Sequence, residues 1–409
     1  MENNNSQKVG VFSLTCITVA FTVTLINFGT GAQTTANLPF AKGILAIIIA
    51  FIILSLLWVF TGLIGFYTKK NAAQILRGVF GKRGAIVPSI IMCIGLIGFS
   101  VFDYWAFGST LKNMFGGDAI FFVGTILGAF VAFLGAYKNI TSYKWLTMIT
   151  IPVAIIVFIA IMAATIKQSG GMEFIVNYVP AQEMPLMLAA NAMVGSFVAV
   201  TTGFNDMTCH AKSRNTVIVA LIAGMAAVAL QFFVGQLGAI GLAIVDFTSL
   251  AACMIGPMFY LSNIFALFAQ GNTNPGTTII VSTQFNVLFR VPWKAIIVIQ
   301  PAICTIGAIA LYLGADISLM SAFTNFLTAL FGPLLAVNIC EFYLVGKRRL
   351  RDESETGSWS AASLISIAVG FIVGVLFNYV IATTLPTIIV VFVIAFVLQA
   401  ILRLGCKMK

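Results

Sequence analysis

The chain has 409 residues, of which 60% are hydrophobic and only 8% charged, and its formal net charge is +10. A water-soluble fold cannot cover so much apolar surface with so few charged side chains, so the composition excludes a soluble globular protein. Apolar segments long enough to cross a bilayer recur along the whole chain, which predicts an all-α polytopic membrane protein. The seven cysteines have no paired spacing, so we expect neither disulfides nor a metal cluster.

Polar and turn-rich segments divide the chain into twelve candidate transmembrane helices. A short polar tail, residues 1–9, leads into the first of them without the features of a cleavable signal peptide. The expected spans are 10–35, 43–68, 85–114, 119–137, 143–167, 186–209, 216–245, 256–286, 292–314, 319–346, 359–380 and 385–404. An even number of spans places both termini on the same side of the membrane.

Lysine and arginine are distributed unevenly between the two sides that these spans define. With the N-terminus in the cytoplasm, the outer loops hold only Lys42, Lys112 and Lys167 of the 22 basic residues. The inner loops and the tails hold the others, including the basic loop 347–358. This asymmetry predicts a bacterial-type inner (plasma) membrane protein with both termini cytoplasmic. The positive charge is therefore a feature of topology, and we expect no nucleic-acid partner.

Glycines and polar residues interrupt the first and sixth spans at similar positions. The first contains Asn-Phe-Gly-Thr-Gly-Ala-Gln-Thr-Thr at 27–35, and the sixth contains Gly-Ser-Phe at 195–197 and a polar stretch at 201–206. Such clusters weaken a helix in lipid and release backbone groups that a ligand, an ion or water then satisfies. The alternative is that the glycines serve only close helix packing. A third polar island, Gln-Gly-Asn-Thr-Asn-Pro-Gly-Thr-Thr, lies at 270–278 in the eighth span.

Broken helices at matching places predict two five-helix repeats of inverted topology, a LeuT-like 5+5 core, with substrate and ion bound beside the breaks. The expected organisation is a first repeat at 10–167, a second repeat at 186–346, the basic loop 347–358, two further helices within 359–404 and a tail at 405–409.

Asp103 is an acid within the apolar stretch 86–108 of the third span. A carboxyl group in the hydrocarbon region is costly, so it normally faces the bundle interior or a wet cavity and marks a transport pathway. Aromatic residues surround it in the sequence, as is typical of a small-ligand site. Three interpretations stay open: a structural hydrogen bond between helices, a direct contact with substrate, and a proton carrier.

Several motifs, in order along the chain, resemble those of the nucleobase-cation-symport-1 family, most closely its cytosine-permease branch. They are Thr30-Gly31-Ala32-Gln33 in the first span, Thr61 to Gly65 and Leu76 to Gly84 around the loop after the second, Gly195-Ser196-Phe197 with Asn205-Asp206 in the sixth, Asn272-Thr273-Asn274 in the eighth, and Cys340-Glu341-Phe342-Tyr343 before Lys347-Arg348-Arg349 in the tenth. The resemblance implies a transporter that imports a planar heterocycle by alternating access. Glu341 is expected to pair with the basic run or to cap an inner gate.

The resemblance also implies where the substrate binds. The two aromatic side chains that enclose the ring fall on Phe99 in the third span and Phe197 in the sixth. Two aromatic planes stack on a flat base and leave its edge free for hydrogen bonds. The expected edge contacts are the amides of Asn272 and Asn274, the carboxyl of Asp103, and unwound backbone at Gly29, Thr30 and Gly31.

The chain departs from the family pattern where a sodium site is expected, because the Ser/Thr pair of relatives falls on Gln270 and Gly271. A hard cation needs several converging oxygens, and two hydroxyls are lost there. A proton on Asp103 is the physical substitute, because burial favours the neutral form of a carboxyl group. The coupling ion is therefore either H+ or Na+, and the candidate ion-coupling residues are Asp103, Asn27, Gln270 and Thr273.

The sequence contains no recognisable set of nucleophile, acid–base or metal residues, so we expect no enzyme, no catalytic residue and no cofactor. It also lacks a nucleotide-binding motif, which argues against ATP as a partner. The prediction is a monomeric symporter in the lipid bilayer that imports a nucleobase, first of all cytosine. The alternatives are another amino-bearing heterocycle such as hydroxymethylpyrimidine, a small cationic solute paired to Asp103, or a passive channel.

Overall fold

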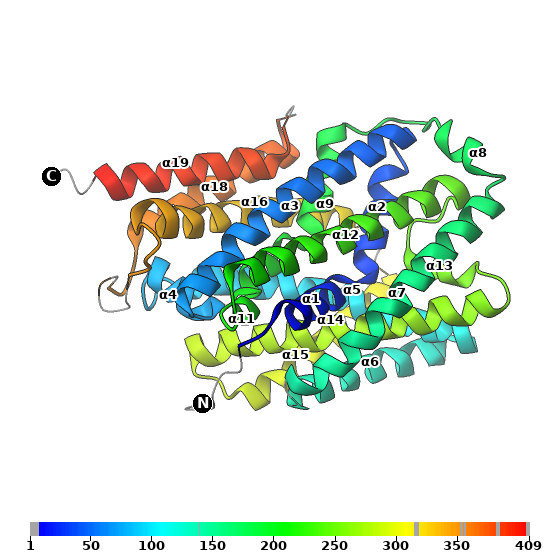
Figure 1. Ribbon diagram of the computed structural model, residues 1–409, viewed down its shortest axis with the longest axis horizontal. Helices are drawn as coiled ribbons and strands as arrows, with labels where there is room; N and C mark the ends of the chain where they lie inside the picture. Colours follow the sequence, from blue (N-terminus) through cyan, green and yellow to red (C-terminus); the bar gives the residue numbers. More distant parts are fainter. Residues whose placement is uncertain are drawn as a thin grey trace.

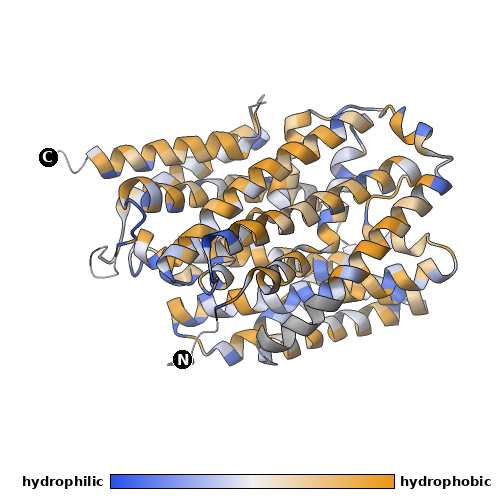
Figure 2. Ribbon diagram, in the orientation of Figure 1, coloured by the Kyte–Doolittle hydropathy of each residue, from blue (hydrophilic) through white to orange (hydrophobic). Residues whose placement is uncertain are grey.

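The computed structural model describes residues 8–138, 140–314, 319–351, 355, 357–381 and 385–405, without the side chains of 138, 140–149 and 321. This part of the chain is helical, with one isolated β-bridge. Most helices run along the long axis of the molecule (Figure 1) and are hydrophobic over most of their length (Figure 2). The all-α fold class expected from composition is confirmed.

The helices follow one another with short connections. Their bounds are α1 (Val11–Thr22), α2 (Leu25–Thr35), α3 (Phe40–Thr68), α4 (Ala72–Phe80), α5 (Ile86–Phe115), α6 (Asp118–Lys138), α7 (Ile140–Gln168), α8 (Met172–Val176), α9 (Leu186–Val198), α10 (Val200–Gly203), α11 (Asn205–Thr208), α12 (Arg214–Leu242), α13 (Phe247–Ala252), α14 (Pro257–Phe289), α15 (Trp293–Gly314), α16 (Leu319–Ile339), the π-helix η1 (Cys340–Val345), α18 (Ala361–Tyr379) and α19 (Thr387–Gly405).

Ten helices in the described part of the chain are long and apolar enough to cross a membrane, and the bent pair α1 and α2 makes an eleventh span. The sequence predicts twelve. The difference is α14, which has 33 residues but carries the polar island 270–278 at its centre and is outside this set. Because every residue of that island is buried, its polar groups face protein and not lipid.

The break in the first span lies before the polar stretch that was expected to cause it. The chain leaves the helix at Val23 and Thr24, both in extended conformation, and α1 and α2 meet at 55°. Residues 27–35 are helical. Glycine there serves packing, since a Cβ on Gly31 would lie 2.4 Å from the carbonyl oxygen of Phe232 in α12. The predicted position of the break is therefore wrong by a few residues.

The other two polar segments are straighter than a broken helix. The sixth span runs from α9 through α10 and α11, with irregular residues at Ala199 and Phe204. In the described residues, α1 and α2 are the one pair of helices that together are apolar enough for a single span and are bent by more than 40° at a short break. Helix α14 continues through Pro275, whose ring packs where Gly135 of α6 has no side chain. Of the two breaks expected in spans one and six, the first is a sharp bend, whereas the sixth span has only irregular residues.

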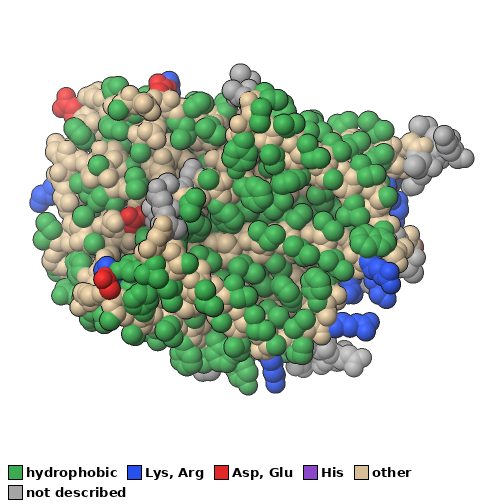
Figure 3. All heavy atoms as spheres, turned by 180° about the vertical axis from the view of Figure 1, so that it is seen from behind, with side chains coloured by type: hydrophobic (Ala, Val, Ile, Leu, Met, Phe, Trp, Pro, Cys, Tyr) green, Lys and Arg blue, Asp and Glu red, His purple; other side chains and the backbone are tan. Residues whose placement is uncertain are grey.

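Two groups of helices pack among themselves. Helices α1, α2, α3, α9 and α12 form one group, and α5, α6, α14 and α15 form the other. Helices α16, α18 and α19 pack together beside the first group. Seen from behind, hydrophobic side chains cover the middle of the molecule and Lys and Arg gather towards one end (Figure 3), the end at which Figure 1 places α4 and the C-terminal part of α19. A hydrophobic middle with basic residues gathered at one end is consistent with a membrane whose normal runs along the long axis of the molecule.

Candidate functional site

The bend between α1 and α2 removes helical hydrogen bonds, and a glutamine from a distant helix replaces them. The side-chain oxygen of Gln231 in α12 accepts from the backbone N–H of Thr24 at 2.9 Å. Its amide nitrogen donates to the carbonyl of Thr22 at 3.1 Å and to that of Ala227 at 2.8 Å. The break is thereby held open by protein groups, which satisfies backbone that would otherwise be buried without a partner.

Asn27 connects this break with the sixth span. Its amide nitrogen donates to the Thr22 carbonyl at 3.0 Å and lies 3.3 Å from the side-chain oxygen of Gln231. Its side-chain oxygen accepts from the hydroxyl of Ser196 in α9 at 3.4 Å. Asn27, one of the candidate ion-coupling residues, thus lies in the hydrogen-bond network at the bend.

Asp103 reaches the same break from the third span. Its side chain is buried, with 1% of the residue exposed, and its Oδ1 accepts from the Thr24 hydroxyl at 3.0 Å. Its Oδ2 has no hydrogen-bond partner among the described residues. The amide of Gln270 in α14 is close enough to interact with the carboxyl group but outside hydrogen-bond geometry. Oδ1 is therefore hydrogen-bonded to Thr24, whereas Oδ2 is buried without a hydrogen bond among the described residues.

Asp103 is one of the residues that line a small cavity. The cavity is lined by three rings, Phe21, Phe99 and Phe197, by the polar residues Thr24, Asp103, Ser196, Thr273 and Thr277, and by Ile26, Leu96 and Val200. The lining comes from α1, α2, α5, α9, α10 and α14, so both helix groups contribute. The cavity has a volume of about 20 Å³, which is room for about one water molecule. A flat ring is larger than this cavity.

The aromatic walls of the cavity are held by further rings. Phe99 meets Phe323 edge-on, with ring centroids 5.3 Å apart. Phe197 packs on Trp58 of α3 at 5.3 Å. Because Phe99 comes from α5 and Phe197 from α9, the two rings belong to different helix groups. A ligand between them contacts both groups at once.

Thr273 lies on the side of the cavity where backbone carbonyls converge. Its hydroxyl oxygen is 3.5 Å from the carbonyl oxygen of Phe21, 3.3 Å from that of Val23 and 3.2 Å from that of Ala269. One hydroxyl hydrogen serves one acceptor, and good O–H···O bonds are shorter. A hard cation that binds oxygens at about 2.3–2.6 Å has neighbouring octahedral ligands about 3.3–3.7 Å apart. The three carbonyl oxygens lie at or near this separation from the Thr273 hydroxyl oxygen, and we call the four oxygens the Thr273 cluster.

Of the remaining candidate residues, the two asparagines lie outside the cavity lining. The amide nitrogen of Asn272 donates to the Thr150 hydroxyl in α7 at 2.6 Å and to the carbonyl of Phe268 in its own helix. The carbonyl of Asn274 accepts from the hydroxyls of Thr277 and Thr278, both at 2.9 Å.

The three candidate residues on α2 are also away from the cavity that Asp103 lines. Gly29 borders a second small cavity with Phe102 and Met320, and a Cβ on it would lie 2.7 Å from the Met320 methyl carbon. The carbonyl of Thr30 accepts from the Thr34 hydroxyl at 2.7 Å. Gly31 allows α2 to approach α12, as described above. The structure therefore brings together Phe99, Asp103, Phe197 and Thr273, with Asn27 and Gln270 beside them.

Sequence reasoning missed Thr24, Gln231, Phe21 and Trp58. Gln231 had a weak signal, because an amide in the middle of an apolar span needs a hydrogen-bond partner, although several other spans of this chain also carry one. Thr24 had none, since a single threonine in a membrane helix commonly bonds its own backbone.

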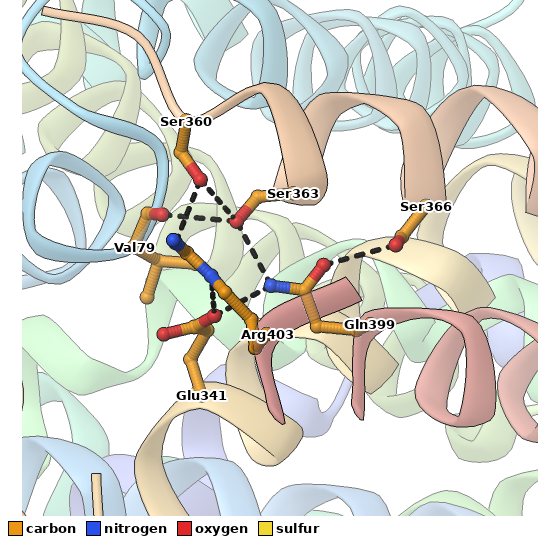
Figure 4. Close-up of polar contacts among 7 residues, drawn as sticks. All are labelled: Val79, Glu341, Ser360, Ser363, Ser366, Gln399 and Arg403. Atoms are coloured by element: carbon orange, nitrogen blue, oxygen red, sulfur yellow. Dashed lines mark hydrogen bonds and ion pairs between the residues drawn. The ribbon is translucent and has the colours of Figure 1, made fainter. Parts of the chain in front are cut away.

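Glu341 makes a different contact from the one expected. Its carboxylate pairs with Arg403 of α19, and not with the run 347–351 beside it in the sequence. Hydrogen bonds extend this pair into a network between η1, α18 and α19, as Figure 4 shows. Gln399 donates to Glu341 and Ser363 and accepts from Ser366, and Arg403 donates to Ser360. The pair is almost fully buried, with side-chain exposures of 4% for Glu341 and 15% for Arg403. It joins the last two helices to the end of α16.

A buried cavity with an acid in its wall, at a bent helix and between two helix groups of an apolar bundle, is typical of a membrane transporter. The comparisons specify the family. A model of permeases for cytosine/purines, uracil, thiamine and allantoin matches residues 5–400, and the chain belongs to this family, as a cytosine permease-like member of the nucleobase-cation-symport-1 transporters.

Two relatives illustrate the range of the family. The cytosine permease of Escherichia coli (strain K12) is 24% identical over 394 residues, which cover 90% of this chain and 86% of the relative. The hydantoin permease of Microbacterium maritypicum is 20% identical over 397 residues, covering 89% and 80%. The fold resembles that of Mhp1 in a closed conformation with bromovinylhydantoin bound, with a TM-score of 0.82 at 17% identity over 99% of this chain and 96% of that one. It also resembles the inward-facing conformation of Mhp1, with a TM-score of 0.80 at 20% identity over 98% and 90%.

Proposed function

We propose that this protein is a secondary active symporter that imports a nucleobase, first of all cytosine, or a closely similar amino-bearing heterocycle. The observation that carries the proposal is a buried acid, Asp103, in the lining of a cavity that Phe99 and Phe197 also line, with its Oδ2 not hydrogen-bonded among the described residues. The family supports a heterocycle as the class of substrate, since its relatives include cytosine and hydantoin permeases.

The chemistry of the cavity favours a ring with an amino group. Phe99 and Phe197 offer two apolar faces for stacking, and Asp103 offers a carboxylate oxygen at the ring edge. Cytosine carries an N4 amino group, which donates, where uracil has an acceptor oxygen. A hydrogen bond from that amino group to the carboxylate is charge-assisted and stronger than one between neutral groups.

Two features support cation coupling by different ions. The oxygen spacing of the Thr273 cluster favours Na+, and the buried carboxyl of Asp103 favours H+. We assign the cluster to sodium, because it uses carbonyls that the bend releases and because the Asp103 oxygen is then left for the substrate. Proton coupling at Asp103 is the alternative, and the ion dependence of uptake separates the two.

The transport cycle that we propose is alternating access in a twelve-span topology. The spans are the ten apolar helices, the bent pair α1–α2 and α14. The repeats are 10–167 and 186–346, with the basic loop 347–358 and the helices of 359–404 outside them, and the short tails 1–9 and 405–409 in the cytoplasm. The gathering of Lys and Arg at one end in Figure 3 supports an inner-membrane location with that end in the cytoplasm. We expect a monomer.

The decisive experiment is uptake of labelled cytosine by proteoliposomes that contain the purified protein. Saturable accumulation against a gradient, with inhibition by unlabelled amino-bearing rings, is the expected result. Imposed Na+ and pH gradients, each applied with and without a protonophore, identify the coupling ion. Flux that neither saturates nor responds to either gradient contradicts a symporter and indicates a channel, whereas competition by small amines but by no heterocycle indicates a cationic substrate.

A further inference from the structure

Gln231 is a fully buried amide in the middle of α12 whose contacts meet the bend of the first span. Its oxygen accepts from the Thr24 N–H at 2.9 Å and lies 3.3 Å from the amide nitrogen of Asn27. Its nitrogen donates to the carbonyls of Thr22 and Ala227 at 3.1 and 2.8 Å. A buried glutamine with acceptor and donor both used is geometrically fixed, because rotating the amide would break bonds on both sides.

The polar groups at the bend have three different partners, which are Gln231, Thr273 and Asp103. Gln231 takes the carbonyl of Thr22 and the N–H of Thr24. The carbonyls on either side of Thr22, those of Phe21 and Val23, are left facing Thr273. The Thr24 hydroxyl is left facing Asp103 at 3.0 Å. The segment that Gln231 holds therefore contributes both to the Thr273 cluster and to the contact with Asp103 in the cavity wall.

We propose that Gln231 is a positioning residue that couples the Thr273 cluster to Asp103 in the cavity wall. It does so by fixing the segment from Phe21 to Thr24, so that the carbonyls of this segment face Thr273 while the Thr24 hydroxyl faces Asp103. The proposal rests on the proposed symport function. Gln231 itself lines neither site. A cation that draws in the carbonyls of Phe21 and Val23 shifts Thr24, and through it the hydrogen bond to Asp103, only while this short segment moves as one unit.

The chain offers a matched control in the same helix. Gln236 is also fully buried, and its nitrogen donates to the carbonyl of Phe40 at 2.8 Å, at the start of α3 and away from the bend. Removing either amide deletes a buried polar group and leaves a partner unsatisfied, so Gln236→Leu reproduces the general cost of the substitution. Only Gln231→Leu releases Thr24.

The test compares wild-type protein, Gln231→Leu, Gln231→Glu and Gln236→Leu in proteoliposomes. For Gln231→Leu we expect the cation concentration for half-maximal uptake to rise about tenfold, while substrate exchange at saturating cation falls less than about threefold. Gln236→Leu should leave the cation dependence within about twofold of wild type. A parallel loss of exchange and accumulation in Gln231→Leu, or an unchanged cation dependence, overturns the proposal.

A second measurement does not depend on transport. Hydrogen–deuterium exchange of peptides that span residues 20–28 reports the protection of the Thr24 N–H. Gln231→Leu should speed exchange in this segment and Gln236→Leu should not, while Gln231→Glu, which keeps an acceptor for Thr24, should retain most of the protection. Unchanged exchange in Gln231→Leu refutes the positioning role even if uptake is altered. If wild-type protein takes up no heterocycle, the proposed function fails, whereas faster exchange confined to Gln231→Leu still supports Gln231 as the residue that holds the bend.

Discussion

Replacing Asp103 by asparagine changes the pattern of donors and acceptors in the cavity without changing its shape. The two side chains have the same size, and the asparagine oxygen can keep the 3.0 Å hydrogen bond from the Thr24 hydroxyl. The amide nitrogen then takes the place of Oδ2, the oxygen without a partner among the described residues. In the proposed site, an acceptor for the ligand thus becomes a donor.

The expected size of the effect follows from that exchange. A hydrogen bond to a charged group contributes about 1.5–3 kcal/mol, so its loss should weaken cytosine binding about 10- to 150-fold. A ring with a carbonyl at the same position, such as uracil, accepts a hydrogen bond from the new amide. Asp103→Asn should therefore weaken cytosine binding and strengthen uracil binding, so the ratio of the two affinities should fall by more than the cytosine affinity alone.

The assay is equilibrium binding of both bases by titration calorimetry, on wild-type protein and the variant, with uptake measured in parallel. Asp206→Asn is the matched control, because Asp206 is also acidic but lies in α11 and accepts from the backbone N–H of Ala72, outside the cavity. Equal losses of cytosine binding in both variants, or a cytosine-to-uracil preference unchanged by Asp103→Asn, would refute direct recognition by Asp103.

Three further predictions concern other residues of the site and the fold. Phe197→Ala removes one stacking face and should weaken ligand binding by about 1–3 kcal/mol, measured by titration; affinity within twofold of wild type would remove the ring from the site. Thr273→Val should raise the Na+ concentration for half-maximal uptake with little change in substrate affinity at saturating Na+, and an unchanged sodium dependence would exclude the Thr273 cluster. Glu341→Gln leaves Arg403 without its carboxylate in a buried position and should destabilise the protein by about 3 kcal/mol, seen as a lower Tm in scanning fluorimetry. An unchanged Tm would mean that the pair does not hold the C-terminal helices.

Much of the architecture could be predicted because membrane helices must be apolar and internally hydrogen-bonded. The apolar segments correspond to the observed helices, and Asp103 stood out because an acid in such a segment is costly. The position of the first break was missed for a physical reason. The glycines at 29 and 31 suggested weakness, yet in lipid small residues also allow helices to pack closely, and Gly31 is in direct contact with α12.

The amides of the eighth span illustrate a second limit. Residues 270–278 are all buried, so no lipid-facing stripe indicates which of them point to the cavity. Neighbouring residues on a helix point about 100° apart, and Thr273 reaches the cavity while Asn272 bonds to Thr150. The sequence does not show how α14 is rotated about its axis, and this rotation decides which polar side chain faces the cavity.

Composition and the lengths of the apolar segments determined that this chain is a helical membrane protein. One acid within such a segment indicated where the site lies, because the cost of a polar group in lipid follows from residue type and span length. Tertiary structure decided which groups complete the site. Thr24 meets Asp103 across 79 residues and Gln231 across 207, and no local pattern encodes such distant pairs. They form because a bent helix leaves backbone groups buried, and whichever side chain the packing brings there must satisfy them.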